Sequence, residues 1–371
     1  MEGLIRRLQW QGSRWWQHQT GKAKAFSSQD RLRVLLLTES NPISQSQVFP
    51  FHFYEKELFA RWRHELREVS TADFEKDPES APGGADIVAV QTWIDLSAER
   101  CDRLFGAIRA RNPKAKIAFL DSFAPVDLRF AKMLDPHVDL YVKKHVFRER
   151  SRYFEPTRGD TNLTDYYGAL YGIDHETTHY EIPPGFLDKL VVGPSFATAP
   201  RMLPHFFDSS THRGATPQFD VHARLAATGS GWYQQMRQSA IDTIDSMRGR
   251  SVLSRLGVSQ RRYMRELRRS RVSFSPFGYG EVCWRDYEAV LCGALLVKPD
   301  MSHVETVPDI FVPFETYIPV AWDFSDLVEK VDRYLNNEAE RVAITSRAYE
   351  RLHRHARSAA FVDQMERLFR V

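Results

Sequence analysis

The sequence predicts an α/β protein of two Rossmann-like domains that face each other across a cleft. The chain has 371 residues, which is too long for one ordinary hydrophobic core and suits two domains. In its first half, apolar strand-like runs alternate with helical patterns, as they do in a doubly wound parallel sheet. In its second half, residues 273–299 read as strand, glycine-rich loop, helix and strand.

The first 203 residues predict a short arm followed by an N-terminal domain. Residues 1–30 form a basic arm that contains tryptophan, and residues 31–203 form the domain. Its elements are expected as strands at 33–38, 87–90, 117–120 and 140–142 and as helices at 51–67 and 97–111. Residues 148–204 are too long for an ordinary connection, so we expect them to hold active-site loops.

The remainder predicts a C-terminal domain over residues 204–350 and a final helix, 351–371, that returns toward the first domain. A strand at 205–207 is expected to run into a polar glycine loop. Helices are expected at 232–247 and 260–269, with a short strand at 252–256 between them. From Phe324 onward the pattern is mostly helical.

The loop within residues 273–299 is suited to binding a ligand. Gly278 and Gly280 bracket Tyr279, so the backbone can bend sharply and approach a ligand closely. A loop of this kind at the carboxyl end of a parallel strand is a common place for phosphorylated ligands in α/β proteins.

The helix after this loop carries charged residues at helical spacing. Glu281 is expected to begin the helix, and Gly293 to end it. Glu281, Arg285 and Glu288 follow one another at i, i+4 and i+7, which places them on one face. Two carboxylates and a guanidinium beside a glycine loop indicate a polar ligand, although Arg285 could simply bridge the two acids.

The same block resembles a known family. Tyr287-Glu288-Ala289, followed by Cys292-Gly293 and ALLVKP, is similar to the nucleotide-sugar-binding segment of GT-B glycosyltransferases, particularly the group 1 and exostosin-like branches. The resemblance covers about 90 residues, from Tyr263 to Tyr349. It implies that Glu288 holds the ribose hydroxyls of the donor and that loop amides face its diphosphate. Many retaining members have two glutamates with seven residues between them. In this sequence the position of the first glutamate, eight before Glu288, is occupied by Gly280.

Further candidates follow other predicted strands. Glu39 and Asp127 lie in loops where a carboxylate could act as a general base, or could merely cap a turn or helix. Arg213 lies beside a glycine, and Lys298 ends a strand, so either could contact a diphosphate. The residues expected in catalysis are therefore Glu281, Arg285, Asp127 and Glu39, and those expected to bind the donor are Arg213, Tyr279, Gly280, Glu288 and Lys298.

The sequence predicts no metal site and no cofactor other than the nucleotide-sugar substrate. His175 and His179 fit the H-E-x-x-H zinc pattern, but Pro183 and Pro184 follow closely, so we expect a polar loop. No Asp-x-Asp triplet occurs. This favours a metal-independent reaction in which cations and loop amides stabilise the leaving group.

The composition of the chain indicates which binding partners and which cellular compartment to expect. A net charge of +3 gives no reason to expect nucleic acid, and the oligomeric state is not indicated. Three cysteines and the lack of a long apolar run favour a cytoplasmic protein. The basic arm at residues 1–24 either packs on the domain or makes a weak contact with a membrane surface.

Together these observations predict a glycosyltransferase that moves a sugar from a nucleotide sugar to a hydroxyl acceptor. A role in surface polysaccharide or glycoconjugate synthesis is the expected setting. The alternatives are a non-catalytic nucleotide-sugar-binding module and a sugar-nucleotide epimerase of the same fold.

Overall fold

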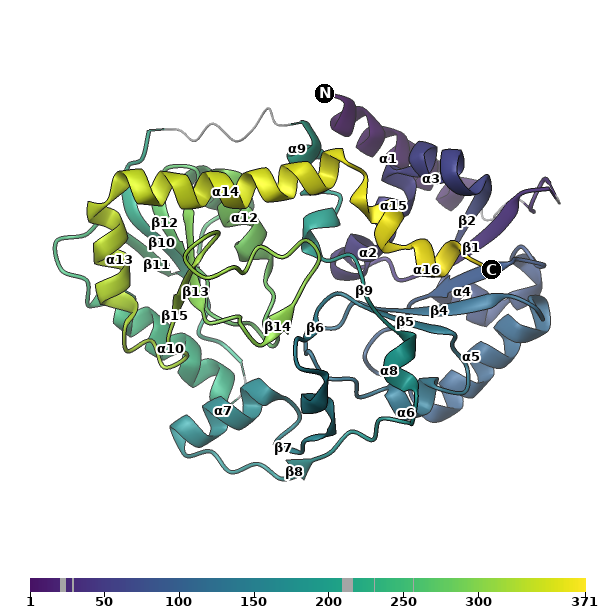
Figure 1. Cartoon of the computed structure of the whole chain (residues 1–371), viewed down its shortest axis with the longest axis horizontal. Coiled ribbons are helices and arrows are strands. Elements are labelled where there is room, and N and C mark those ends of the chain that lie inside the picture. Colours follow the sequence, from purple (N-terminus) through teal and green to yellow (C-terminus); the bar gives the residue numbers. More distant parts are fainter. Residues whose placement is uncertain (21–24, 29, 209–215, 230, 256) are drawn as a thin grey trace.

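The computed structural model describes residues 1–20, 25–28, 30–208, 216–229, 231–255 and 257–371. Two α/β domains lie side by side, each with a central parallel sheet (Figure 1). The predicted fold class is thereby confirmed.

The N-terminal sheet has six strands in the order β2-β1-β3-β4-β5-β9, all parallel. Its strands are β1 (Leu32–Thr38), β2 (His64–Ser70), β3 (Ile87–Val90), β4 (Lys116–Asp121), β5 (Leu140–Lys143) and β9 (Leu190–Val192). The middle strands are buried on both faces, which is why they read as continuous apolar runs.

Helices cover this sheet on both sides. They are α2 (Pro42–Phe53), α3 (Glu55–Trp62), α4 (Thr71–Lys76), the short η1 (Pro78–Ser80), α5 (Ala98–Arg111) and α6 (Ala131–Leu134). Ser97 is the N-cap of α5, because its side chain accepts a hydrogen bond from the backbone N–H of Arg100.

The helix predicted at 51–67 is wrong, because this stretch contains the end of α2, all of α3 and part of the edge strand β2. β2 has the polar sequence HELREVS, which does not predict a strand. Its buried acids have partners from outside the strand: Glu65 accepts from the Ser27 backbone N–H at 2.9 Å, and Glu68 accepts from the Thr38 hydroxyl at 2.8 Å.

The C-terminal sheet has five parallel strands in the order β11-β10-β12-β13-β15. They are β10 (Phe219–Leu225), β11 (Val252–Arg255), β12 (Ser270–Phe274), β13 (Leu295–Pro299) and β15 (Ile318–Val320). The helices of this domain are α10 (Gly231–Asp245), α11 (Gln260–Leu267), α12 (Trp284–Cys292) and α13 (Leu327–Asn336). The strand predicted at 205–207 is wrong: these residues lie in helix α9 (Leu203–Asp208), and the strand is β10.

A long excursion from the N-terminal sheet reaches the other domain. It contains β6 (Val146–Phe147), η2 (Arg150–Phe154), β7 (Thr157–Arg158), α7 (Asn162–Tyr171), β8 (Thr177–Thr178) and α8 (Phe186–Lys189), and η3 (Phe196–Thr198) follows β9. β6 pairs antiparallel with β14 (Val304–Glu305) of the C-terminal domain. The Tyr167 ring on α7 stacks on Trp232 of α10, with ring centroids 5.6 Å apart. These contacts hold the excursion against both domains.

The chain ends on the domain where it began. Helix α14 (Glu338–Arg357) runs across the C-terminal domain, and α15 (Ala360–Gln364) and α16 (Glu366–Phe369) then lie on the N-terminal domain (Figure 1). Phe361 packs edge-on against Phe51 at 4.9 Å, and Lys116 Nζ donates to the Arg370 carbonyl at 2.6 Å.

The N-terminal arm is helix α1 (Glu2–Thr20), and it packs on the body of the protein. A Cβ on Gly3 would lie 2.8 Å from the Pro204 carbonyl oxygen of α9, and the Trp10 ring meets Phe49 of α2 at 4.9 Å. The membrane-surface contact considered for this arm stays a prediction. Within the described ranges, no helix has the length and apolar character needed to span a bilayer.

Candidate active site

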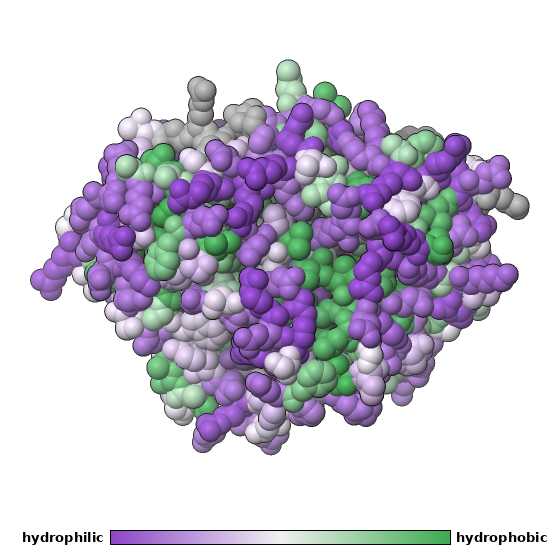
Figure 2. All heavy atoms as spheres, in the orientation of Figure 1, coloured by the Kyte–Doolittle hydropathy of each residue, from purple (hydrophilic) through white to green (hydrophobic). Residues whose placement is uncertain are grey.

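The carboxyl ends of the two sheets meet where the domains touch. The loop 275–283, which follows β12, reaches across to the loop after β4. A Cβ on Gly280 would lie 1.8 Å from the Ala124 carbonyl oxygen, so only glycine allows this approach. Figure 2 shows apolar surface gathering near the middle of the view, where the two domains meet.

Glu281 is part of the interface between the domains. It is fully buried, and its Oε2 lies 3.2 Å from Nε2 of His145, in the loop between β5 and β6. Its Oε1 lies 3.9 Å from Nε2 of His303. Burial by itself raises the pKa of Glu281, but hydrogen bonds from His145 and His303 outweigh it and hold that pKa well below its usual range. Glu281 therefore stays an anion inside the interface.

The prediction that Glu281 begins the helix and shares a face with Arg285 and Glu288 is wrong. Helix α12 begins at Trp284, with Cys283 as its N-cap and Asp286 closing the capping box. Glu281 lies two residues before this cap and faces the N-terminal domain. Only Arg285 and Glu288 are on α12 itself.

Three cations from three elements converge on the start of α12. Arg285 lies in its first turn, Arg237 comes from α10, and Lys144 comes from the loop after β5. All three are within electrostatic reach of the Cys283 side chain. Lys144 and Arg237 are buried, being 1% and 6% exposed.

Among the described residues, Lys144 and Arg237 form no ion pair, although Asp121 and Glu281 lie within electrostatic reach of Lys144. The described contacts of Lys144 and Arg237 are with aromatic rings, Phe196 at 4.5 Å and Tyr233 at 5.0 Å. Burial, followed by the neighbouring Lys143, lowers the pKa of Lys144 to about 8. Burial and the nearby Arg285 likewise lower the pKa of Arg237. An arrangement of this kind is costly unless an anion binds to it.

Glu288 lies at the edge of this cation cluster. Its Oε1 is 3.3 Å from Arg201 Nη2, and Tyr263 forms side-chain hydrogen bonds with both Glu288 and Arg285. Arg201 also lies over the Trp284 ring at 3.9 Å. The ribose-binding role predicted for Glu288 stays a prediction, now with Arg201 as a competing partner.

Two further donor candidates occupy different surroundings. Tyr279 is 52% exposed and stacks on Tyr233 with ring centroids 4.2 Å apart. Lys298 is fully buried, and its Nζ is 3.2 Å from Asp286 Oδ1. Because Lys298 is enclosed and neutralised, it does not present its charge to the cleft, contrary to the expectation from sequence.

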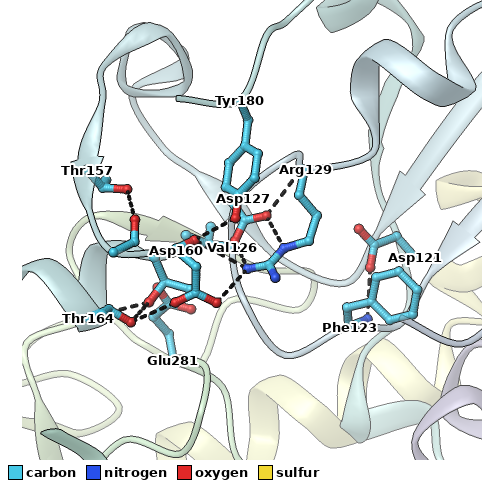
Figure 3. Close-up of polar contacts among 12 residues, drawn as sticks. Asp121, Phe123, Val126, Asp127, Arg129, Thr157, Asp160, Thr164, Tyr180 and Glu281 are labelled. Atoms are coloured by element: carbon cyan, nitrogen blue, oxygen red, sulfur yellow. Dashed lines mark hydrogen bonds and ion pairs between the residues drawn. The ribbon is translucent and has the colours of Figure 1, made fainter. Parts of the chain in front are cut away.

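The base candidates Asp127 and Glu39 lie in separate places. Both oxygens of Asp127 are held by Arg129, at 2.8 and 2.7 Å, with Tyr180 beside the guanidinium (Figure 3). This pairing leaves Asp127 poorly placed to accept a proton. Glu39 follows β1 and is partly buried, and burial raises its pKa.

The remaining sequence candidates are not part of this cluster. Arg213 lies outside the described residues. His175 precedes the short strand β8, so the H-E-x-x-H stretch is not helical and its two imidazoles do not share a helix face. In the described part of the chain, no group of three or more His, Cys, Asp or Glu side chains is placed to hold a metal ion.

Sequence reasoning missed Lys144, His145 and Arg237. Lys144 and His145 follow an apolar strand directly, in the same position that drew attention to Lys298. Arg237 stands beside Met236 on the buried face of an amphipathic helix, where a cation is unusual. Both signals were present in the sequence.

Comparison with known proteins identifies the fold. Residues 206–367 match the family described as glycosyl transferase-like. An alpha-glucosyltransferase in complex with UDP and a 13-mer DNA containing a HMU base covers 91% of this chain, with 99% of its own length matched, at 9% identity and a TM-score of 0.54. The chain has the GT-B glycosyltransferase fold. A glycosyltransferase from Rickettsia africae ESF-5 is also similar, at 10% identity, with coverage of 91% and 98% and a TM-score of 0.50.

The GT-B resemblance seen in the sequence is therefore confirmed. The match of the C-terminal domain to a glycosyltransferase family supports sugar transfer from a nucleotide sugar. Among curated proteins, none matches this chain in sequence.

The expectation that nucleic acid is not a partner is corrected. Two of the similar structures are alpha-glucosyltransferase complexes with UDP and DNA, so proteins of this fold do bind nucleic acid. The argument from a net charge of +3 fails because a local basic surface, rather than the total charge, attracts phosphates.

Proposed function

We propose that this protein transfers a sugar from a nucleoside-diphosphate sugar to a hydroxyl acceptor, with the diphosphate bound by Lys144, Arg237 and Arg285. The observation that carries the proposal is the buried cation cluster at the start of α12, two members of which, Lys144 and Arg237, form no ion pair among the described residues. A diphosphate supplies the missing negative charge, and the N-terminus of α12 adds a favourable dipole.

In this transfer, the acceptor oxygen bonds to the anomeric carbon while the bond between that carbon and the diphosphate breaks. The electron pair leaves with the nucleoside diphosphate, and the proton of the acceptor hydroxyl passes to the departing diphosphate or to water. The three cations stabilise the negative charge that develops on the departing diphosphate. Arg237 and Lys144 are already desolvated, so their attraction for this charge is strong.

The same arrangement supports a reaction without a metal ion, since fixed side-chain cations can perform the charge neutralisation that Mg²⁺ performs elsewhere. UDP is the first nucleotide to test, because an alpha-glucosyltransferase of similar fold is a complex with UDP. Surface polysaccharide or glycoconjugate synthesis and a cytoplasmic location stay predictions from the sequence.

The test is calorimetric titration of the full chain with UDP, UMP and uridine, followed by assays with UDP-sugars and GDP-sugars. We expect UDP to bind more tightly than UMP, and uridine to bind most weakly, because the cations contact the diphosphate. We also expect slow release of nucleoside diphosphate from one donor.

Other outcomes separate the alternatives. Tight binding with no release of nucleoside diphosphate would identify a binding module, and interconversion of free nucleotide sugars would identify an epimerase. Equal affinities for nucleoside and nucleoside diphosphate would refute the diphosphate site.

A further inference from the structure

A second polar site lies beside the cation cluster but shares none of its residues. It is a cavity of about 750 Å³ between the excursion that carries α7 and the loops after β13 and β15. Its size falls within the range of small-molecule sites. Neither Lys144, Arg237, Arg285 nor Glu288 lines it.

One wall of the cavity is aromatic. Trp322, from the loop after β15, meets Tyr166 of α7 edge-on, with ring centroids 5.0 Å apart. His303 lies against the same indole at 5.0 Å. The Trp322 indole is fixed because its Nε1–H donates to the Asp300 carbonyl at 2.9 Å. Rigid aromatic faces of this kind pack well against the C–H face of a sugar ring.

The cavity also offers hydrogen-bonding groups that lack protein partners. Asn162, at the start of α7, is only 9% exposed, yet neither Nδ2 nor Oδ1 has a hydrogen-bond partner among the described residues. A buried amide left unsatisfied is costly, which indicates that something else bonds to it. A hydroxyl group, which both donates and accepts, satisfies both ends of this amide.

The charge of the lining favours a neutral ligand. Glu155, Asp165 and Asp300 contribute three carboxylates, against one guanidinium, Arg152. Within the described ranges, Glu155 and Asp165 have no ion-pair partner, and Arg152 lies over the Phe147 ring at 4.5 Å. The excess of carboxylates repels a phosphate group but can accept hydrogen bonds from hydroxyls.

We propose that this cavity binds the acceptor, and that the acceptor is a carbohydrate; this inference rests on the proposed glycosyl transfer. The cavity adjoins the donor loop through His303, whose Nε2 is 3.9 Å from Glu281 Oε1, next to Gly280. A sugar that packs on this aromatic wall is therefore close to the donor loop, because the Trp322 ring also lies 5.0 Å from that of His303.

The test uses the full chain and a set of neutral methyl glycosides and disaccharides, including those of glucose, galactose and N-acetylglucosamine, with binding followed by saturation-transfer NMR. Tyr166→Ala and Asp165→Asn change the cavity, and both residues are partly exposed, so folding should be preserved. Phe59→Ala is the matched aromatic control, because Phe59 is 41% exposed on α3 and does not line the cavity.

We expect at least one saccharide to bind the wild type and the control, and to bind at least tenfold more weakly to both cavity variants. Titration with UDP is run in parallel and should be unchanged by these variants. If UDP binds but no saccharide does, or if the cavity variants bind saccharide normally, the carbohydrate site is refuted while the proposed function survives. If a short DNA duplex, and not a saccharide, depends on Tyr166 and Asp165, the assigned ligand class is wrong.

Discussion

Replacement of Arg237 by methionine should have opposite effects on the free and the nucleotide-bound protein. Arg237 is 6% exposed, its Nε has no hydrogen-bond partner among the described residues, and burial together with Arg285 lowers its pKa. In the free protein, the guanidinium is therefore a buried charge beside another cation. Methionine removes that charge and keeps most of the side-chain volume.

The two effects can be estimated. Removing a buried charge that lacks an acidic partner should stabilise the free protein by about 1 kcal/mol. This raises the melting temperature by roughly 2–4 °C for a domain of this size. In the complex, the variant loses charge-assisted hydrogen bonds to the diphosphate worth about 1.5–3 kcal/mol each. UDP should then bind about 10- to 150-fold more weakly.

Differential scanning fluorimetry of the free protein and calorimetric titration with UDP and uridine measure both effects. Arg248→Met is the matched control, because Arg248 follows the same helix but is exposed, and it should change neither quantity. The affinity for uridine should not depend on Arg237. If Arg237→Met lowers the melting temperature and leaves UDP affinity unchanged, the residue is structural and the diphosphate site is wrong.

Three further predictions follow from the site. The pKa of Lys144 is lowered from 10.5 to about 8, so UDP affinity should fall as pH rises through 8 and Lys144 loses its charge. The contribution of Lys144 to folding stability should rise between pH 8 and 10.5, because the unfolded chain still binds this proton there. Lys144→Met should abolish the pH dependence of UDP affinity in titrations at several pH values. Turnover with an identified donor should persist in EDTA, and a complete loss that added metal reverses would contradict the metal-independent reaction. Glu288→Ala should weaken UDP binding about 10- to 150-fold; if Arg201→Ala and Glu288→Ala instead lower only the melting temperature, the two residues form a structural pair.

Much of the fold could be predicted because it depends on local patterns of apolar and turn-forming residues. The middle of each of β1, β3, β4, β5 and β13 is buried on both faces, so each of these strands contains a run of at least three apolar residues. The C-cap of α12 could also be predicted from the sequence, because Gly293 adopts a positive φ of 76° that other residues rarely adopt. The edge strand β2 was not predicted because its buried acids accept hydrogen bonds from residues distant in sequence, such as Ser27 and Thr38.

The sequence by itself determined the two α/β domains, the glycine loop after β12 and the glycosyltransferase resemblance, since these depend on residues close together along the chain. Only the tertiary structure decided which charged side chains have an oppositely charged partner. Glu281 is paired with His145, 136 positions away, and Lys298 is neutralised by Asp286, whereas Lys144 and Arg237 are buried with no ion-pair partner among the described residues. The physical reason is that the role of a charge depends on its burial and on its nearest opposite charge, and both are set by long-range packing.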